Sequence, residues 1–316
     1  MGMIHMRVVS PSDLTDGLLR ILAADQGVLN LVVLRGQASN PNGDAIEFDV
    51  LNSTANTMLR TFRQMHLDRR GSIVIEPVEL AISVAADETE NRQLGRLARV
   101  PVWEEVEARI RAGGSYAPSF YLYLVIAGVI GAVGILTNSQ ILIVAAMVVG
   151  PEYGAITSIA LGLDRRDRRS VRDGLFALVV GFLVAIVAAL AFGATIRWLD
   201  LEPMAFNLGV RPVTHLIDTP NIYSVVVALL AGIVGIVSLT EARTSTLLGV
   251  FISVTTIPAA SDIGVATAFG SWSEARGSLL QLLLNILILI VVGLLTLKMV
   301  RLIWQRISNR RGKEES

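Results

Sequence analysis

The stretch NSQILIVAAMVVGPEYGAITSIALGL, residues 138–163, decides the fold class. Between residues 141 and 163 it carries a single charged side chain, Glu152, which directly follows Gly150-Pro151. A helix rises 1.5 Å per residue, so a segment of this length can cross the roughly 30 Å apolar core of a bilayer. Proline removes a backbone donor and breaks or bends the helix that contains it. The stretch therefore predicts a transmembrane helix that is interrupted near its middle.

Five further apolar segments are long enough to span a membrane. They are residues 120–136, 175–196, 222–239, 246–269 and 279–300. The segment 246–269 contains Pro258, so we expect it to be interrupted as well. Hydrophobic residues make up 53% of the 316 residues and charged residues 17%, against about 25% charged in soluble domains. These features predict an α-helical polytopic membrane bundle of six transmembrane helices.

The first 84 residues differ from this pattern, because strand-like and helix-like segments alternate there. Apolar and acidic side chains alternate over residues 46–50, as in a half-buried strand. Other strands are expected at 6–10, 28–34 and 72–84, and helices after residue 10 and over 53–67. The resulting order, β-α-β-β-α-β, is ferredoxin-like and resembles small ligand-sensing domains of the ACT type. We expect an α+β domain that binds a small molecule or pairs with another sheet.

A linker separates this domain from the membrane segments. Within residues 85–118, Val102, Trp103, Val106 and Ile110 form an apolar stripe at helical spacing. The stripe predicts an amphipathic helix on the domain or at the membrane surface. The expected organisation is a soluble domain at 1–84, the linker at 85–118, a transmembrane domain at 119–304 and a basic tail at 305–316.

Basic residues indicate the orientation in the membrane. The loop 165–172 holds five arginines, and the segment 298–313 holds six lysines and arginines. Six spans place both segments on the same side as the N-terminal domain, and the positive-inside rule makes that side cytoplasmic. We therefore expect a multi-pass protein of a prokaryotic cell (inner) membrane with both termini cytoplasmic.

The membrane segments contain an internal repeat. Residues 127–137 read AGVIGAVGILT, and residues 231–240 read AGIVGIVSLT. Each copy precedes a proline-interrupted span and a further apolar span, which suggests two three-helix units at about 119–198 and 221–304. An odd number of crossings per unit makes the second unit inverted relative to the first. Inverted repeats with interrupted helices in corresponding positions are typical of transporters with a binding site near the bilayer midplane.

Residues 138–163, together with IPAASDIGVATAFGSW at 257–272, resemble the bacterial and archaeal membrane family catalogued as domain of unknown function 389. The resemblance covers about residues 118–300 and implies a membrane location and this architecture, but no activity. The chain departs from the family pattern at Glu152, where an apolar residue is usual, and at Ala259, where a second proline is common. The acidic residue is therefore a feature of this protein.

The candidate binding residues surround the two interruptions. Ionisable groups inside a membrane are expensive and usually face a cavity, a partner or a water path. Glu152 is therefore expected to carry a proton or, with backbone carbonyls freed by the prolines, to coordinate a cation. The alternative is a purely structural hydrogen bond within the bundle. The full candidate set is Glu152, Asp262, Pro151, Pro258, Gly150, Thr255, Thr256, Asn138 and Asn285.

No enzyme motif is found, and the histidines at 5, 66 and 215 are scattered, so we expect no enzyme, cofactor or metal site. The expected partners are the lipid bilayer and a small solute or ion. A homo-oligomer is left open, and no nucleic acid is expected. The sequence favours a transporter or channel for a small solute or ion. The alternative is a membrane-anchored sensor or scaffold whose N-terminal domain binds a ligand or partner.

Overall fold

The computed structural model describes residues 3–25, 27–78, 103–114, 116–207, 219, 221–240 and 255–314. The chain divides into two compact units, Met1–Val106 with Ile307–Ser316, and Glu107–Arg306. The described strands all belong to the first unit, whereas the second contains the long apolar helices.

The first unit contains a four-stranded antiparallel sheet. Its elements are β1 (Met3–Ser10), α1 (Ser12–Ala24), β2 (Val28–Ser39), β3 (Asn42–Leu51), α2 (Asn52–Gln64), α3 (Leu67–Arg70) and β4 (Ser72–Pro77). The strands lie in the order β2-β3-β1-β4 and every neighbouring pair is antiparallel. The predicted order of elements is thus found, with the short α3 added. The helix predicted over 53–67 ends at Gln64, because His66 adopts a left-handed φ of 57°.

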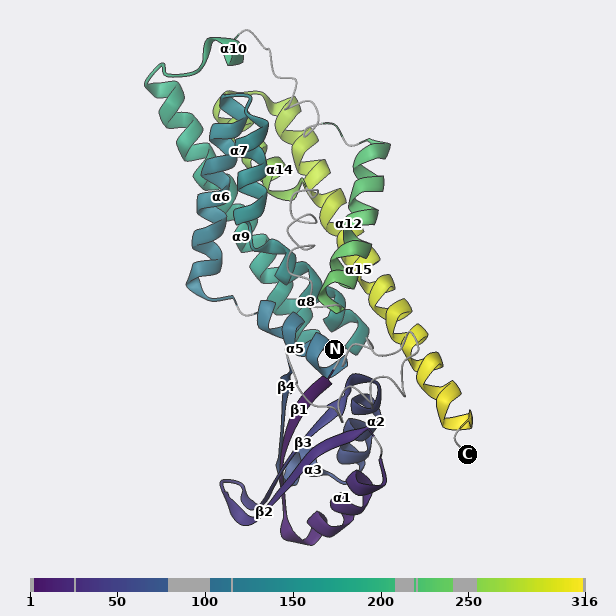
Figure 1. Ribbon diagram of the computed structural model, residues 1–316. Coiled ribbons are helices and arrows are strands. Elements are labelled where there is room, and N and C mark those ends of the chain that lie inside the picture. Colours follow the sequence, from purple (N-terminus) through teal and green to yellow (C-terminus); the bar gives the residue numbers. More distant parts are fainter. Residues whose placement is uncertain are drawn as a thin grey trace. The chain divides into compact units, whose positions relative to one another are not determined.

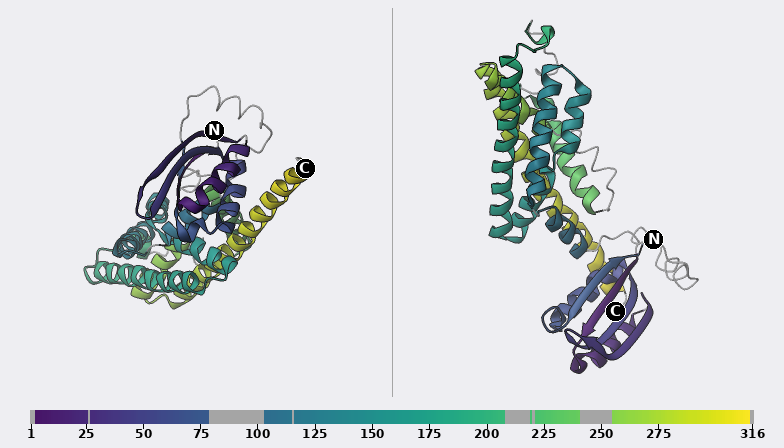
Figure 2. Two further views of the ribbon diagram at one scale, coloured as in Figure 1. Left: turned by 90° about the horizontal axis from the view of Figure 1, so that it is seen from below. Right: turned by 90° about the vertical axis from the view of Figure 1, so that its left-hand side faces the viewer.

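The alternation of apolar and acidic side chains along β3 places the apolar ones in the core of this unit. Ile46, Phe48 and Val50 are fully buried, as expected for a strand with one covered face. Helices α1 and α2 lie on the same face of the sheet (Figures 1 and 2). Phe62 of α2 meets Phe48 edge-on with the ring centroids 6.4 Å apart. The hydrophobic effect of burying these side chains therefore fixes the helices on the sheet.

The second unit is helical. Its elements include α5 (Trp103–Gly113), α6 (Pro118–Leu136), α7 (Gln140–Val149), α8 (Glu152–Arg165), α9 (Arg168–Trp198), α10 (Met204–Asn207), α12 (Ile222–Thr240), α14 (Thr256–Ala268) and α15 (Trp272–Glu314). Among the described residues, α6, α9, α12 and α15 are long and apolar enough to cross a membrane. Helices α7 and α8 meet the same criterion as a pair bent by 49°. The break predicted at Gly150-Pro151 is therefore observed.

The sixth predicted span, 246–269, is only partly described. Helix α14 covers its second half, and residues 246–254 lie outside the described part of the chain. Four to five spans are thus found in the described ranges, and the count of six stays a prediction, as does the inverted repeat. The expected position of the break is wrong: Pro258 is the third residue of α14 rather than an interruption within it. Proline is tolerated there because the first-turn N–H groups lack intrahelical partners anyway.

Small residues allow the helices of the bundle to approach closely. A side chain at Gly128 of α6 would collide with the backbone of Ala185 in α9, and one at Gly264 of α14 would collide with the backbone of α9 at Ile186. Gly235 of α12 lies against the ring of Tyr153 in α8. Close backbone approach through glycine is the usual way in which membrane helices gain van der Waals contact.

A charged network at one end of the bundle joins segments that are distant in sequence. Glu107 of α5 is paired with Arg165 at the end of α8, and Arg301 of α15 is paired with Asp164. Arg301 also lies 3.9 Å from Glu107. Helix α9 begins near this network, and at its far end Arg197 donates a 2.6 Å hydrogen bond to the carbonyl of Ala268. The start of the membrane unit, the loop after α8 and the end of the apolar part of α15 thus share one end of the bundle, as the charge pattern requires.

This arrangement allows a direct test of the orientation. The chain has no cysteine, so single cysteines can be introduced without background labelling. Cysteines at Ser119 and Ser308 should resist membrane-impermeant thiol reagents in intact cells, and a cysteine at Thr214 should react. All three should react after permeabilisation. Labelling at Ser308 but not at Thr214 in intact cells would reverse the predicted orientation.

Candidate functional site

Two helices begin in the interior of the second unit and are joined by a buried hydrogen bond. The hydroxyl of Thr256, the first residue of α14, donates to Oε1 of Glu152, the first residue of α8, over 2.7 Å. Glu152 is 7% exposed and Thr256 fully buried. Two of the predicted site residues, 104 positions apart in sequence, are therefore in direct contact.

The electrostatics of the helix ends explain why a carboxylate is tolerated here. The N-terminus of an α-helix carries unpaired N–H groups and a partial positive charge. Glu152 occupies the first turn of α8, and its side chain reaches the first residue of α14. Two positive helix ends therefore stabilise one carboxylate, which offsets part of the cost of burying it.

Gly150 brings the end of α7 against the start of α14. A Cβ atom at Gly150 would lie 2.7 Å from Cγ1 of Ile257, and it would also collide with Oε2 of Glu152. Only glycine leaves room for both neighbours. The break between α7 and α8 is thus positioned at the beginning of α14, and Oε2 of Glu152 points toward the end of α7.

Polar side chains continue from α14 onto α15. Nδ2 of Asn285 donates to the hydroxyl of Thr255 over 2.8 Å, and Nε2 of Gln281 donates to Oδ1 of Asn285 over 3.2 Å. One turn further along α15, the hydroxyl of Ser278 donates to Oδ2 of Asp262 over 2.6 Å. Thr255, Asn285, Gln281, Ser278 and Asp262 form what we call the polar row. It extends along one face of α15 from Thr255, next to the Glu152–Thr256 pair, to the buried carboxylate of Asp262.

Sequence reasoning missed two members of the polar row, Ser278 and Gln281. Both are fully buried. The signal was present in their spacing, because positions 278, 281 and 285 recur at the period of one helix face. These are the polar positions of an otherwise apolar stretch of α15, so the spacing predicts the face that packs on α14.

Asn138 does not belong to this cluster. It occupies the turn between α6 and α7 with a left-handed φ of 51°. Gly150 follows the opposite end of the ten-residue α7, about 15 Å away at 1.5 Å per residue. The structure therefore does not bring Asn138 together with Glu152, and its part in the site stays a prediction.

Three buried oxygen atoms near these residues have no hydrogen-bond partner within the described part of the chain. They are Oε2 of Glu152, Oε1 of Gln281 and Oγ of Ser261. A buried polar atom without a partner costs free energy and calls for an explanation, such as a functional role or an unseen water or ion. Two of the three, the carboxylate and the amide oxygen, can only accept.

The linker helix α5 packs beside this site. A Cβ atom at Gly154, two residues after Glu152, would collide with the carbonyl oxygen of Gly113 at the end of α5. Val106 and Ile110, from the predicted apolar stripe, are buried. The carboxylate of Glu107 anchors the other end of α5 through Arg165. From Glu107 to Gly113, helix α5 thus contacts α8.

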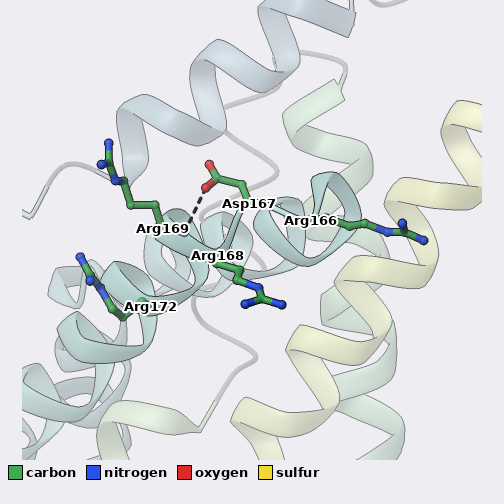
Figure 3. Close-up of a pocket in the computed structure, with 5 residues that line it drawn as sticks. All are labelled: Arg166, Asp167, Arg168, Arg169 and Arg172. Carbon is green, nitrogen blue, oxygen red and sulfur yellow. Dashed lines mark hydrogen bonds between the residues drawn. The ribbon is translucent and has the colours of Figure 1, made fainter.

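The arginine-rich loop forms an open pocket of about 500 Å³ lined by Arg166, Asp167, Arg168, Arg169 and Arg172. Asp167 caps α9 by accepting from the backbone of Arg169 at 3.0 Å. The hydroxyl and backbone N–H of Ser170 and the N–H of Arg169 hold the pKa of Asp167 below its ordinary value. Figure 3 shows Arg169 and Arg172 extending to one side of the loop and Arg166 and Arg168 to the other. The pocket therefore does not gather its charges on one ligand, and the loop is best explained as a topology signal.

Comparisons with known proteins agree with the predicted resemblance. The model of the family described as "Domain of unknown function (DUF389)" matches residues 147–291. An uncharacterized protein of Methanocaldococcus jannaschii is 22% identical over 166 residues, which cover 52% of this chain. The chain spans about half the length of that relative, because the matched part covers 49% of it. No solved structure matches. The resemblance is thus confirmed.

Proposed function

We propose that this membrane protein, which matches a family of unknown function, is a transporter or channel for a small solute or ion. The observation that carries the proposal is the meeting of two helix starts at a buried carboxylate, where Thr256 of α14 bonds Glu152 of α8. Helices interrupted within the membrane are typical of substrate and ion sites in transporters. A purely structural bundle has no need of a buried carboxylate with an oxygen that lacks a hydrogen-bond partner in the ranges that the structure describes.

The proposed binding site comprises Glu152, Thr256 and the end of α7 at Gly150. Glu152 is nearly enclosed, so substrate exchange requires the helices around it to move. In transporters of this kind, one bundle rocks against the other around a fixed site. The two units of the predicted inverted repeat would provide the two bundles, and the hydrogen bond between Glu152 of the first unit and Thr256 of the second supports a site between them.

Reconstitution of the full-length protein tests this proposal. Sealed proteoliposomes should show flux above that of protein-free liposomes for at least one member of a panel of protons, alkali cations, halides and small metabolites. If the panel shows no protein-dependent flux, and the purified protein instead binds a metabolite through its N-terminal domain, the sensor alternative is correct.

A further inference from the structure

Three helix ends meet at Glu152, and they do not carry the same partial charge. The starts of α8 and α14 are positive ends, and Oε1 of Glu152 is satisfied there by Thr256. The end of α7 at Val149 is a negative end. Oε2 of Glu152 points toward that negative end, over Gly150, and has no hydrogen-bond partner in the described part of the chain.

The proline adds to the negative character of this spot. In a continuous helix, residue 151 would donate its N–H to the carbonyl of Met147. Pro151 has no N–H, so it cannot make that bond. The carbonyl oxygens in the last turn of α7 lack intrahelical partners, because no further helical N–H groups follow them. The break between α7 and α8 thus offers unpaired carbonyl oxygens at the end of α7, and Oε2 of Glu152 lies beside Gly150.

The chemistry of the unsatisfied atoms selects the ligand class. Oε2 of Glu152 and Oε1 of Gln281 are oxygen acceptors, and no basic side chain in the described ranges pairs with Glu152. An anion would be repelled by these oxygens. A divalent cation generally needs several carboxylates or retained water, whereas one carboxylate with neutral oxygens matches a single positive charge. In the polar row, the amide oxygen of Gln281 can coordinate a metal cation but does not take up a proton near neutral pH.

We infer that Glu152 binds an alkali-metal cation through Oε2 and the carbonyl oxygens that end α7, and that the cation reaches it along the polar row. This inference rests on the proposed transport function and names the ion that the site carries or uses for coupling. The polar row is the proposed route because Ser278, Gln281 and Asn285 recur on one face of α15. Ser278 is hydrogen-bonded to Asp262 at one end, and Gln281 is linked through Asn285 to Thr255 at the other. Each oxygen along it can replace a water molecule in the hydration shell of the ion.

The site can be tested without measuring transport. The purified full-length protein should unfold at a temperature about 3 °C or more higher in sodium or potassium chloride than in choline chloride of equal ionic strength. Choline is too large for a site enclosed to this degree. Glu152→Gln should abolish the difference between the salts, whereas Thr296→Val, which removes a buried hydroxyl of α15 outside the polar row, should keep it.

The route is tested by Gln281→Leu, which removes the unsatisfied amide oxygen at similar volume. It should slow alkali-cation flux at least tenfold and leave the stabilisation by the cation intact, because the site at Glu152 remains.

Equal unfolding temperatures in all three salts, or a sodium or potassium effect that survives Glu152→Gln, would overturn the inference, and so would a response to pH alone. Flux of a neutral solute with no cation dependence would retain the proposed function and refute this inference. Stabilisation by the cation without any flux would retain the cation site at Glu152 and refute the proposed transport function.

Discussion

Glu152→Gln should reduce protein-dependent flux at least tenfold while leaving the amount of correctly inserted protein unchanged. Glutamine has nearly the same shape, and its amide oxygen can still accept the hydrogen bond from Thr256. The substitution removes the negative charge and turns the unsatisfied Oε2 into a donor group that faces the end of α7. A group that binds and releases a positive ion cannot function after this change, whereas a structural hydrogen bond survives it. Flux into proteoliposomes at several pH values measures the effect.

A matched control separates the charge at the site from charge in general. Glu274→Gln makes the same chemical change in the first turn of α15, outside the Glu152 cluster, and should keep wild-type flux. Size-exclusion chromatography in detergent would verify that both variants are folded. If Glu152→Gln shows the flux and the pH profile of the wild type, the carboxylate is structural and transport does not depend on it.

Arg301→Ala should lower the free energy of unfolding of the membrane unit by about 2–3 kcal/mol. Arg301 is paired with Asp164, whose side chain is only 4% exposed, and it lies 3.9 Å from Glu107. Removing one partner of a buried ion pair costs about 3–5 kcal/mol, because the other charge stays desolvated and unpaired. The lower figure applies here because the Arg301 side chain is 20% exposed and water can partly replace it.

Thermal unfolding in detergent tests this prediction. Arg172→Ala is the control, because that side chain is 78% exposed and its pair with Asp173 should contribute little. In the double variant Arg301→Ala/Asp164→Asn, much of the lost stability should return, because no buried carboxylate is left without a partner. If Arg301→Ala unfolds at the wild-type temperature, the network does not hold α8, α5 and α15 together.

Several features of the site could be predicted from the sequence because they depend on local chemistry. Proline at 151 breaks a helix wherever that helix lies, so the end of α7 and the start of α8 follow from the chain itself. At Pro258 the same reasoning failed. A proline can equally lie in the first turn of a helix, and which of the two occurs depends on where the helix begins, at Thr256 in this chain.

Contacts between distant segments could not be predicted in the same way. Nothing in the sequence states that Thr256 reaches Glu152, or that Asn138 stays at the far end of α7. The charged network at Glu107 was also missed, because its members come from α5, α8 and α15 and each alone resembles an ordinary topology signal. Such contacts depend on the rotation and depth of each helix, which packing between helices fixes.

The sequence by itself determined that this is a membrane protein with an N-terminal α+β domain and a helix broken at Gly150-Pro151. Hydrophobic length, strand alternation and proline act within a single segment, and the bilayer and the backbone impose their requirements on that segment alone. The tertiary structure alone decided that the start of α14 meets Glu152, with Oε1 satisfied by Thr256 and Oε2 without a hydrogen-bond partner among the described residues. Such a group gains its function from the dipoles and acceptors that surround it. The ends of α7 and α8 are its neighbours in sequence, but the start of α14 is supplied by a residue 104 positions away.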